Sequence, residues 1–406
     1  MKKSVLFVDD DQNMLDALRR MLRPMSQEWD QHFVRSGDEA LVVLACNNVD
    51  VVMTDMRMPG MDGGQLLKII QEARPDVVRI VLSGHADYNM VMRSVKQAHQ
   101  FLTKPCSADD IRETLERAYN LRRILTNESA KNIVSRIETL PSLPDLYLRV
   151  VEEVQKEDGN LGTVARIISE DPAMTAAILK MVNSSFFGFF RPLTNPAQAV
   201  NLLGTEIIKG LILSAHLFSV FDFSRFPRYS MDVLVDHSLA TGRIASAIAT
   251  FEGMPPEMVD ECFIAGMLHD VGKLILASRF EVEYLGILAT VRNENRTVWE
   301  VEREVLATSH AELGAYLLGL WNLPGAVVDA LAFHHEPGLA GCGRDFTPLT
   351  AVHAANALEH ELRIINKDYA QHPPDPAYLE HMGLTSHLPQ WKELCSAIYS
   401  QQNGQD

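Results

Sequence analysis

The sequence predicts two folds in series: a doubly wound α/β domain with a five-stranded parallel sheet, followed by an all-α helical domain. Three observations support this. The chain has 406 residues, too many for one hydrophobic core, so it should divide into two or three domains. Up to about residue 125, short apolar runs alternate with helical segments. From about residue 130 onward the strand pattern is gone, and helical patterns follow one another without a repeating period.

Five short apolar runs predict the strands of the first domain, and helical periodicity fills the intervals between them. The strands are expected at residues 4–8, 31–35, 50–54, 78–82 and 100–103. The helices are expected near residues 12–22, 38–46, 64–73, 87–97 and 108–125. Because each helix returns the chain to the same edge of the sheet, this strict alternation requires parallel strands.

Polar side chains follow four of the predicted strands. Asp9 and Asp10 come after the first strand and Asp55 ends the third. Ser83 follows the fourth strand and Lys104 follows the fifth. Because the carboxyl ends of parallel strands share one edge, these side chains should lie together. Three carboxylates there would repel one another unless a cation lay among them, and oxygen ligands of this kind suit Mg²⁺.

These residues predict a site of phosphoryl transfer. Asp55 would accept the phosphoryl group, while Asp10, with Asp9 at one remove, would hold Mg²⁺. Ser83 and Lys104 would supply the hydroxyl and the ammonium that the transferred group requires. Any one of the five could be a cap or a surface residue, but their position at successive strand ends favours a site.

Residues 3–122 closely resemble the receiver domain of bacterial two-component response regulators, which has a flavodoxin-like fold. The matching motifs are Val8-Asp9-Asp10, Asp55-Met56-Arg57-Met58-Pro59, Leu82-Ser83-Gly84 and Phe101-Leu102-Thr103-Lys104-Pro105. The resemblance implies phosphotransfer from a sensor histidine kinase to Asp55, with the Arg57 carbonyl completing the Mg²⁺ site. It also implies a switch in which Ser83 moves toward the phosphoryl group and Phe101 turns inward. Phe101 lacks the hydroxyl that many relatives carry there.

The domains are expected at residues 1–122 and 133–406, joined by a linking helix at residues 123–132. Ser107 is a good N-cap for the helix that leads into this linker. An apolar stripe follows the cap: Ile111, Leu115, Ala118, Leu121 and Leu125. A stripe of this length either pairs with its copy in a homodimer or packs within its own chain, and the sequence leaves both alternatives open.

Histidines gather at particular places in the all-α part, each at a predicted helix end or beside a carboxylate. They are His237, the pair His269-Asp270 followed by Gly272-Lys273, His310, and the pair His334-His335. Imidazoles and a carboxylate brought together from separate helices could hold one or two divalent metals such as Mn, Fe or Zn. Such metals would activate water against a phosphodiester.

Residues 133–360 resemble the HD phosphohydrolase superfamily, and more closely its HDOD branch. The matching stretches include Leu140-Pro141-Ser142-Leu143-Pro144, Ile168-Ser169-Glu170-Asp171-Pro172, Val182-Asn183-Ser184-Ser185-Phe186-Phe187-Gly188 and Ala199-Val200-Asn201-Leu202-Leu203-Gly204. The resemblance implies the following metal ligands: His237, His269, Asp270, His310, and His334 or His335. It also implies that Lys273 contacts phosphate.

Two departures from the catalytic relatives favour a binding module over an enzyme. HD-GYP phosphodiesterases follow His-His-Glu with Gly-Tyr-Pro, whereas this chain continues Glu336-Pro337-Gly338. Their closing metal-bound Asp falls near Asn356, a neutral amide, with His353 one turn earlier as a substitute. The expected function is therefore a response regulator whose HDOD half binds downstream signalling proteins. The alternative is a phosphorylation-gated phosphodiesterase acting on a cyclic dinucleotide or a guanosine polyphosphate.

Composition and charge limit the kinds of partner that the protein is expected to bind and indicate its cellular compartment. The net charge is −16, and residues 1–125 carry 17 Lys and Arg against 18 Asp and Glu, leaving 20 against 35 for the remainder. So acidic a second part disfavours nucleic-acid binding. No signal peptide or membrane insertion is expected, because no apolar run approaches the length of a membrane span. Five scattered cysteines indicate reduced thiols in a cytoplasmic protein.

Overall fold

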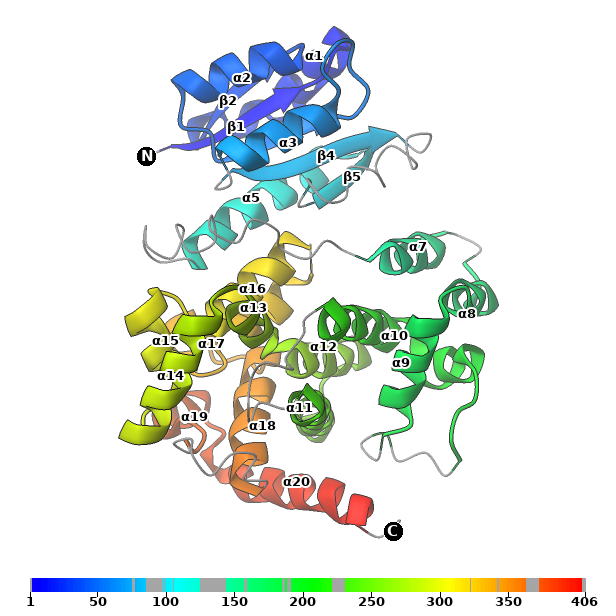
Figure 1. Cartoon of the computed structure of the whole chain (residues 1–406), viewed down its shortest axis with the longest axis vertical. Coiled ribbons are helices and arrows are strands. Elements are labelled where there is room, and N and C mark those ends of the chain that lie inside the picture. Colours follow the sequence, from blue (N-terminus) through cyan, green and yellow to red (C-terminus); the bar gives the residue numbers. More distant parts are fainter. Residues whose placement is uncertain are drawn as a thin grey trace. The chain divides into compact units, whose positions relative to one another are not determined.

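The structure is a computed structural model of the chain, shown in Figure 1. It describes residues 2–74, 77–84, 98, 100–104, 106–124, 144–156, 159–184, 187, 191–220, 231–321, 323–341, 343–362 and 372–403. These residues form two compact units, drawn mainly from residues 1–142 and residues 143–406. Each unit is described by itself below.

The first unit is built on a parallel sheet of five strands in the order β2-β1-β3-β4-β5. The strands are β1 (Lys3–Val8), β2 (Trp29–Val34), β3 (Val51–Asp55), β4 (Val78–Gly84) and β5 (Gln100–Lys104). Strand β3 is buried along its whole length, as expected of a central parallel strand covered on both faces. The predicted five-stranded parallel sheet is confirmed, and every strand begins and ends within two residues of its expected position.

The strand order places the carboxyl ends of β1 and β3 side by side at the point where the order reverses. From β1 the chain first adds β2 on one side and then crosses to β3 on the other. In open α/β sheets, sites lie beyond the strand ends at such a reversal. Asp9 follows β1 and Asp55 ends β3, so the fold alone brings these two residues to neighbouring positions.

Helices cover both faces of this sheet (Figure 1). They are α1 (Gln12–Met21), the 3₁₀ turn η1 (Arg23–Gln27), α2 (Gly37–Cys46), α3 (Gly63–Ala73) and α5 (Ala108–Ile124). Asp11, Ser36 and Asp62 cap the first three helices with side-chain oxygens, which satisfies amide groups that have no partner inside a helix. The helix expected near residues 87–97 lies outside the described residues.

Helix α5 is fastened to the sheet by its apolar stripe and by one carboxylate. Ile111, Leu115 and Ala118 are buried, with at most 1% of their surface exposed. Glu116 binds Lys3 Nζ at 2.5 Å and accepts a hydrogen bond from Trp29 Nε1 at 3.0 Å. This part of the stripe therefore packs within its own chain. The linking helix is predicted at residues 123–132; its first two residues end α5, and residues 125–132 lie outside the described residues.

The second unit is helical throughout its described residues, as predicted. Its α-helices are α7 (Asp145–Val154), α8 (Leu161–Ser169), α9 (Pro172–Val182), α10 (Pro196–Val220), α11 (Met231–Phe251), α12 (Pro256–Leu268), α13 (Val271–Arg279), α14 (Glu281–Glu294), α15 (Val298–Leu306), α16 (His310–Leu320), α17 (Gly325–Phe333), α18 (Pro348–Leu362), α19 (Pro376–Met382) and α20 (Leu388–Asn403). Two 3₁₀ turns join them, η3 (Pro337–Ala340) and η4 (Thr385–His387).

Glycines let the helices around α11 and α13 approach at backbone distance. A Cβ added at Gly266 of α12 would lie 2.8 Å from Gly242 Cα on α11. A Cβ added at Gly272 of α13 would lie only 1.9 Å from the carbonyl oxygen of His310, which begins α16. Only a residue without a side chain can occupy these positions while the helices stay so close. The second contact places the start of α16 against the turn that carries Asp270.

Helix α10 differs from the expectation that no apolar run approaches the length of a membrane span. By length and composition alone, this helix is long and apolar enough to cross a membrane. Half of its apolar window is buried inside the unit, and Ile208, Leu211 and Ile212 belong to the hydrophobic core. Gly204 interrupts the helix with φ of 78° and ψ of 170°. The buried core helix of a globular domain can have the same length and apolar composition as a membrane span.

Candidate functional site

Three charged side chains meet at the sheet edge beyond β1 and β3. Lys104 Nζ lies 2.8 Å from Asp9 Oδ2 and also contacts Asp55 Oδ1. Both carboxylates are buried, with 3% of Asp9 and 8% of Asp55 exposed. Burial by itself would lower the pKa of Lys104, but its hydrogen bonds to Asp55 and Asp9 and their charges raise it. The ammonium therefore stays protonated between the two carboxylates.

Backbone amides hold the other oxygens of these carboxylates. The amide of Arg57 donates to Asp55 Oδ2 at 2.7 Å, and the amide of Asp11 donates to Asp9 Oδ1 at 3.0 Å. Asp10, next along the chain, is only partly buried. Three carboxylates against one ammonium leave excess negative charge in a setting of oxygen donors, so the residues present suit a hard divalent cation such as Mg²⁺.

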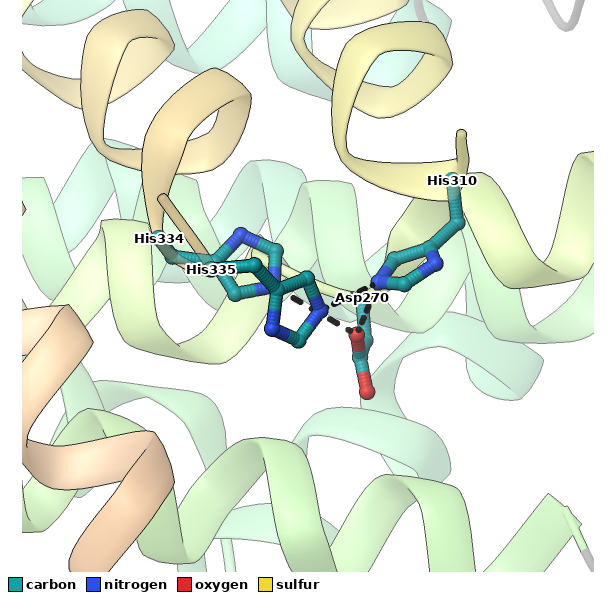
Figure 2. A group of neighbouring side chains, drawn as sticks. All are labelled: Asp270, His310, His334 and His335. Atoms are coloured by element: carbon teal, nitrogen blue, oxygen red, sulfur yellow. Dashed lines mark hydrogen bonds and ion pairs between the residues drawn. The ribbon is translucent and has the colours of Figure 1, made fainter. Parts of the chain in front are cut away.

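In the second unit, histidines from several helices converge on Asp270, and Figure 2 shows three of them around its carboxylate. His310 begins α16, while His334 and His335 follow α17. His237 lies within α11 and His269 directly follows α12. His237, His269, Asp270, His310 and His334 are at most 3% exposed, and His335 is partly exposed.

Asp270 lies between two groups of imidazoles and offers one oxygen to each. Its Oδ1 is 3.3 Å from His310 Nε2 and 4.0 Å from His334 Nε2. Its Oδ2 is 3.4 Å from His237 Nε2 and 3.5 Å from His269 Nε2. Burial would raise the pKa of Asp270, but its interactions with His269 and Lys273 and its hydrogen bonds with His237 and His310 hold that pKa well below its usual value. Asp270 is therefore an ionised carboxylate that could bridge two ions.

Four of the imidazoles are oriented by hydrogen bonds on their outer nitrogen. His269 Nδ1 donates to the carbonyl of Gly266 at 2.7 Å, and His334 Nδ1 donates to the carbonyl of Leu331 at 2.8 Å. His237 Nδ1 lies 2.7 Å from Glu359 Oε2, and His310 Nδ1 lies 2.6 Å from Glu302 Oε2. Because these oxygens only accept, each Nδ1 carries a proton, and in the neutral ring each Nε2 presents a lone pair.

The inward nitrogens create a demand for positive charge. His237 Nε2 faces His269 Nε2 at 3.1 Å, and His310 Nε2 faces His335 Nε2 at 2.9 Å. Lone pairs at these distances repel unless a proton or a metal ion lies between them. In addition, His334 Nε2 and Asp270 Oδ1 are buried without a hydrogen-bond partner. A divalent transition metal bound by these atoms would remove both problems, so the residues fit such an ion.

The histidines of the cluster differ in the direction in which their pKa values are shifted. Burial, with the nearby His237 charge, lowers the pKa of His269 to about 3, and burial also holds the pKa values of His334 and His335 well below normal. Burial opposes the charged form of His237 too, but Glu359 and Asp270 raise its pKa to about 9. His269, His334 and His335 are therefore neutral at pH 7, the state that a metal ligand requires.

Side chains outside the cluster hold His335 and the turn that follows α17. Trp299 stacks on the His335 ring, with centroids 3.8 Å apart and planes 12° from parallel. Arg303 donates to Glu312 Oε1 at 3.0 Å and also binds Glu336, the residue after His335. These contacts tie the turn that follows α17 to the first turn of α16.

Comparison with known families matches both units. Residues 5–116 match the response regulator receiver domain, and residues 140–337 match the HDOD domain. The chain joins a receiver domain to an HDOD domain. Receiver and HD-type domains generally bind divalent metals, which agrees with the two sets of ligands described above.

Curated relatives match one part of the chain at a time. An uncharacterized protein of Treponema pallidum is 28% identical over 225 residues, which are 55% of this chain and 42% of that protein. The hydrogenase transcriptional regulatory protein HoxA of Cupriavidus necator is 38% identical over 117 residues, 28% of this chain and 24% of that protein. The chain thus spans less than half the length of these relatives.

Solved structures resemble the HDOD part in fold. An HDOD domain protein of unknown function from Geobacter sulfurreducens has a TM-score of 0.53 at 24% identity, covering 70% of this chain and 97% of that chain. A putative phosphohydrolase from Shewanella amazonensis SB2B has a TM-score of 0.53 at 19% identity, covering 68% and 97%. At these identities the likeness establishes the fold alone.

The structure brings together most of the site residues expected from the sequence. In the receiver domain, Asp9, Asp55 and Lys104 are in contact, and the side chains of Ser83 and Phe101 lie outside the described residues. In the HDOD domain, all the predicted ligands converge, and both His334 and His335 take part. Lys273, predicted to contact phosphate, donates to Asp270 Oδ2 at 2.6 Å.

Of the two positions considered for the closing ligand, His353 is engaged elsewhere. His353 donates from Nδ1 to the His334 carbonyl at 2.7 Å and accepts from the Asp375 amide at 2.8 Å, so both its nitrogens are engaged. His353 therefore holds the backbone of the predicted ligand His334 and does not replace the closing ligand. Asn356 is buried, and its Oδ1 has no hydrogen-bond partner.

Three residues of the cluster escaped the sequence analysis. Glu302 and Glu359 are fully buried beside His310 and His237, and His360 lies 4.7 Å from His237 between ring centroids. His237, Glu359 and His360 form a further group whose ligand atoms lie within 4.8 Å of one another. The available signal was the pair Glu359-His360, one turn after Asn356 in the same predicted helix.

Proposed function

We propose that this protein is a response regulator in which a phosphoryl group on Asp55 controls the HDOD domain. The observation that carries the proposal is the buried contact of Asp9, Asp55 and Lys104 at the switch point of a receiver-type sheet. Relatives that share the receiver domain are response regulators, and their phosphodonors are sensor histidine kinases.

The chemistry follows from the groups present. A carboxylate oxygen of Asp55 attacks the phosphorus of the donor, the bond from phosphorus to the donor atom breaks, and an acyl phosphate forms. Lys104, already held at Asp55, offsets the charge on the transferred group. Asp9 and Asp10 would hold Mg²⁺, which supplies further charge neutralisation when bound.

The HDOD domain is the output, and we propose that it acts mainly by binding a downstream signalling protein around a metal-bound core. After His334-His335-Glu336 the chain reads Pro337-Gly338-Leu339 where catalytic relatives have Gly-Tyr-Pro, and Asn356 stands at the closing position, which supports a binding role. A homodimer is compatible with this output. Its test is the oligomeric state of the phosphorylated protein.

A second candidate function is metal-dependent hydrolysis of a phosphodiester. The observation that favours it is that all the predicted histidine ligands gather around Asp270, while His335 and His360 keep some exposure. Lys273 is 14% exposed in its side chain and could contact a phosphate there. A cyclic dinucleotide or a guanosine polyphosphate would be the substrate.

One experiment separates these functions. Protein purified without chelator is analysed for Mn, Fe and Zn, phosphorylated with a small phosphodonor, and mixed with a cyclic dinucleotide. Bound metal without turnover in either phosphorylation state supports the binding module. Hydrolysis that depends on Asp55 phosphorylation supports the phosphodiesterase.

Coupling between the domains is proposed to pass through α5, which follows Lys104 directly along the chain. Phosphorylation adds charge and strong acceptor oxygens beside Lys104, and such changes act by shifting an element between two arrangements. Small-angle scattering of phosphorylated and unphosphorylated protein should give different profiles. The variant Arg112→Glu tests the exposed face of α5, where Arg112 pairs with Asp109. Leu115 is unsuitable for this test, because it is only 1% exposed and a lysine in its place would bury a charge. Identical wild-type profiles would make α5 a passive connection.

A further inference from the structure

The HDOD match ends at residue 337, but the ligand network continues well beyond it. Glu359 lies on α18 and is fully buried. Its Oε2 is 2.7 Å from His237 Nδ1. Its other oxygen, Oε1, accepts a hydrogen bond from the Tyr399 hydroxyl at 2.8 Å. One carboxylate thus joins a predicted metal ligand to the C-terminal helix α20.

Helix α20 is fixed by contacts of its own. Trp391 and Cys395 are fully buried, and Trp391 Nε1 donates to Glu252 Oε1 at 2.9 Å. Tyr399 lies four residues after Cys395, and so on the same face of the helix. The hydroxyl of Tyr399 is therefore presented to Glu359 by a helix that is packed in place, and does not depend on a flexible terminus.

We propose that Tyr399 and Glu359 are positioning residues that fix His237 as a metal ligand. This inference rests on the proposed metal binding at the Asp270 cluster. A carboxylate that accepts from Nδ1 keeps the proton on that nitrogen and makes Nε2 a stronger donor toward a metal. The Tyr399 hydroxyl occupies the second carboxylate oxygen, which prevents Glu359 from rotating away from His237.

A matching arrangement on the opposite side of the cluster supports this role. Glu302 is fully buried and binds His310 Nδ1 at 2.6 Å. It also accepts from the His310 backbone amide at 2.8 Å. Glu302 belongs to the HDOD match, whereas Glu359 and Tyr399 lie beyond it. The segment after residue 337 thus supplies one of the two carboxylates that each hold a predicted ligand histidine.

The position of Glu359 also bears on the amide at Asn356. The two residues lie one turn apart on α18, and the closing metal-bound Asp of the catalytic relatives falls near the earlier position. Here the buried negative charge stands one turn later and acts through the His237 ring. The helix keeps a carboxylate near the cluster, but in a supporting position.

Titration of the metal-free full-length protein with Co²⁺, followed by visible absorption, tests the proposal. The spectrum reports affinity, stoichiometry and ligand geometry together. Glu359→Gln keeps the shape and removes the charge, and we expect about 10- to 100-fold weaker binding of Co²⁺ with unchanged stoichiometry. Tyr399→Phe keeps the ring and removes only the hydroxyl, and we expect a weakening of several-fold. Ser400→Ala is the matched control, because among the described residues the Ser400 hydroxyl bonds within its own helix, to the Ser396 carbonyl.

The outcomes are distinguishable. If the wild type binds no Co²⁺, the proposed metal centre fails and this inference fails with it. If the wild type binds and both variants bind equally well, only the positioning role is overturned. Loss of one equivalent of Co²⁺ in Glu359→Gln would make Glu359 a direct ligand and also overturn that role. Should Glu359→Gln melt early, Tyr399→Phe decides alone, since it leaves the buried carboxylate in place.

Discussion

The two charged sites of this molecule are built in opposite ways. At the receiver edge, Asp9, Asp55 and Lys104 lie at the ends of strands β1, β3 and β5 of one sheet, and two carboxylates share one ammonium. In the HDOD domain, histidines in or directly after α11, α12, α16 and α17 surround one carboxylate, and carboxylates or carbonyls hold four of the rings from outside.

This difference indicates two kinds of metal chemistry. Oxygen ligands beside a partly exposed Asp10 suit Mg²⁺, which keeps several of its waters and exchanges readily. Buried imidazoles with oriented lone pairs suit a transition metal that stays with the folded protein and contributes to its stability. Under the proposed function, the first site would hold a transient phosphoryl group and the second a resident ion.

The largest expected effect concerns the receiver site. Asp55→Asn removes the only oxygen nucleophile proposed there, so labelling by a small phosphodonor with Mg²⁺ should be abolished. Radiolabel incorporation or intact mass measures it. The HDOD variant His269→Ala serves as the control and should label like wild type. Equal labelling of Asp55→Asn and wild type would place the phosphoacceptor at another residue. It would then contradict the assignment of the receiver edge as the phosphorylation site.

The second effect concerns stability. His269→Ala combined with Asp270→Ala should release the HDOD metal, because it removes the bridging carboxylate and one imidazole. An ion present at about a thousand times its Kd stabilises by about 4 kcal/mol, which corresponds to a shift in melting temperature of about 10 °C. Metal analysis and thermal melting measure both. A wild type that melts identically with chelator and with Mn²⁺, Fe²⁺ or Zn²⁺ would contradict the resident ion.

A smaller effect is expected from Glu302→Gln, which keeps the size of the side chain but weakens its hold on His310 Nδ1. Metal affinity should fall about 10-fold or more, as is typical when a carboxylate behind a ligating histidine is lost. Competition with a coloured chelator measures it. Asp55 labelling should be unchanged, and a parallel loss of labelling would show that the two sites are not independent.

The smallest effect concerns the attachment of α5 to the sheet. Glu116→Ala removes the partner of Lys3 and of Trp29 Nε1, and we expect a loss of about 1 kcal/mol in receiver stability. Asp109→Ala, which removes an exposed ion pair on the same helix, is the control and should change stability by less than about 0.5 kcal/mol. Hydrogen exchange of receiver-domain amides at increasing urea concentration measures both. Equal losses would assign no special role to Glu116.

The sequence by itself determined the receiver half almost completely. Strict alternation of strands and helices sets the direction of every strand, and parallel strands put Asp9, Asp55 and Lys104 at one edge whatever the details of packing. The local signals were also sufficient for the caps: Ser107 Oγ accepts from the Asp110 amide at 3.1 Å, as its position predicts.

Only the tertiary structure decided the HDOD cluster. The histidines could be singled out as a set, but Glu302 and Glu359 could not, because helix periodicity places residues on a face and says nothing about which other helix that face will meet. Gly272 shows the reason: the absence of one side chain lets α16 approach α13 and brings His310 to Asp270, residues 40 positions apart in sequence. Likewise, the membrane-like composition of α10 reflects a core position that only packing reveals. In a sheet, chain direction fixes where strand ends meet, whereas in a helical domain the meeting points depend on contacts between side chains distant in sequence.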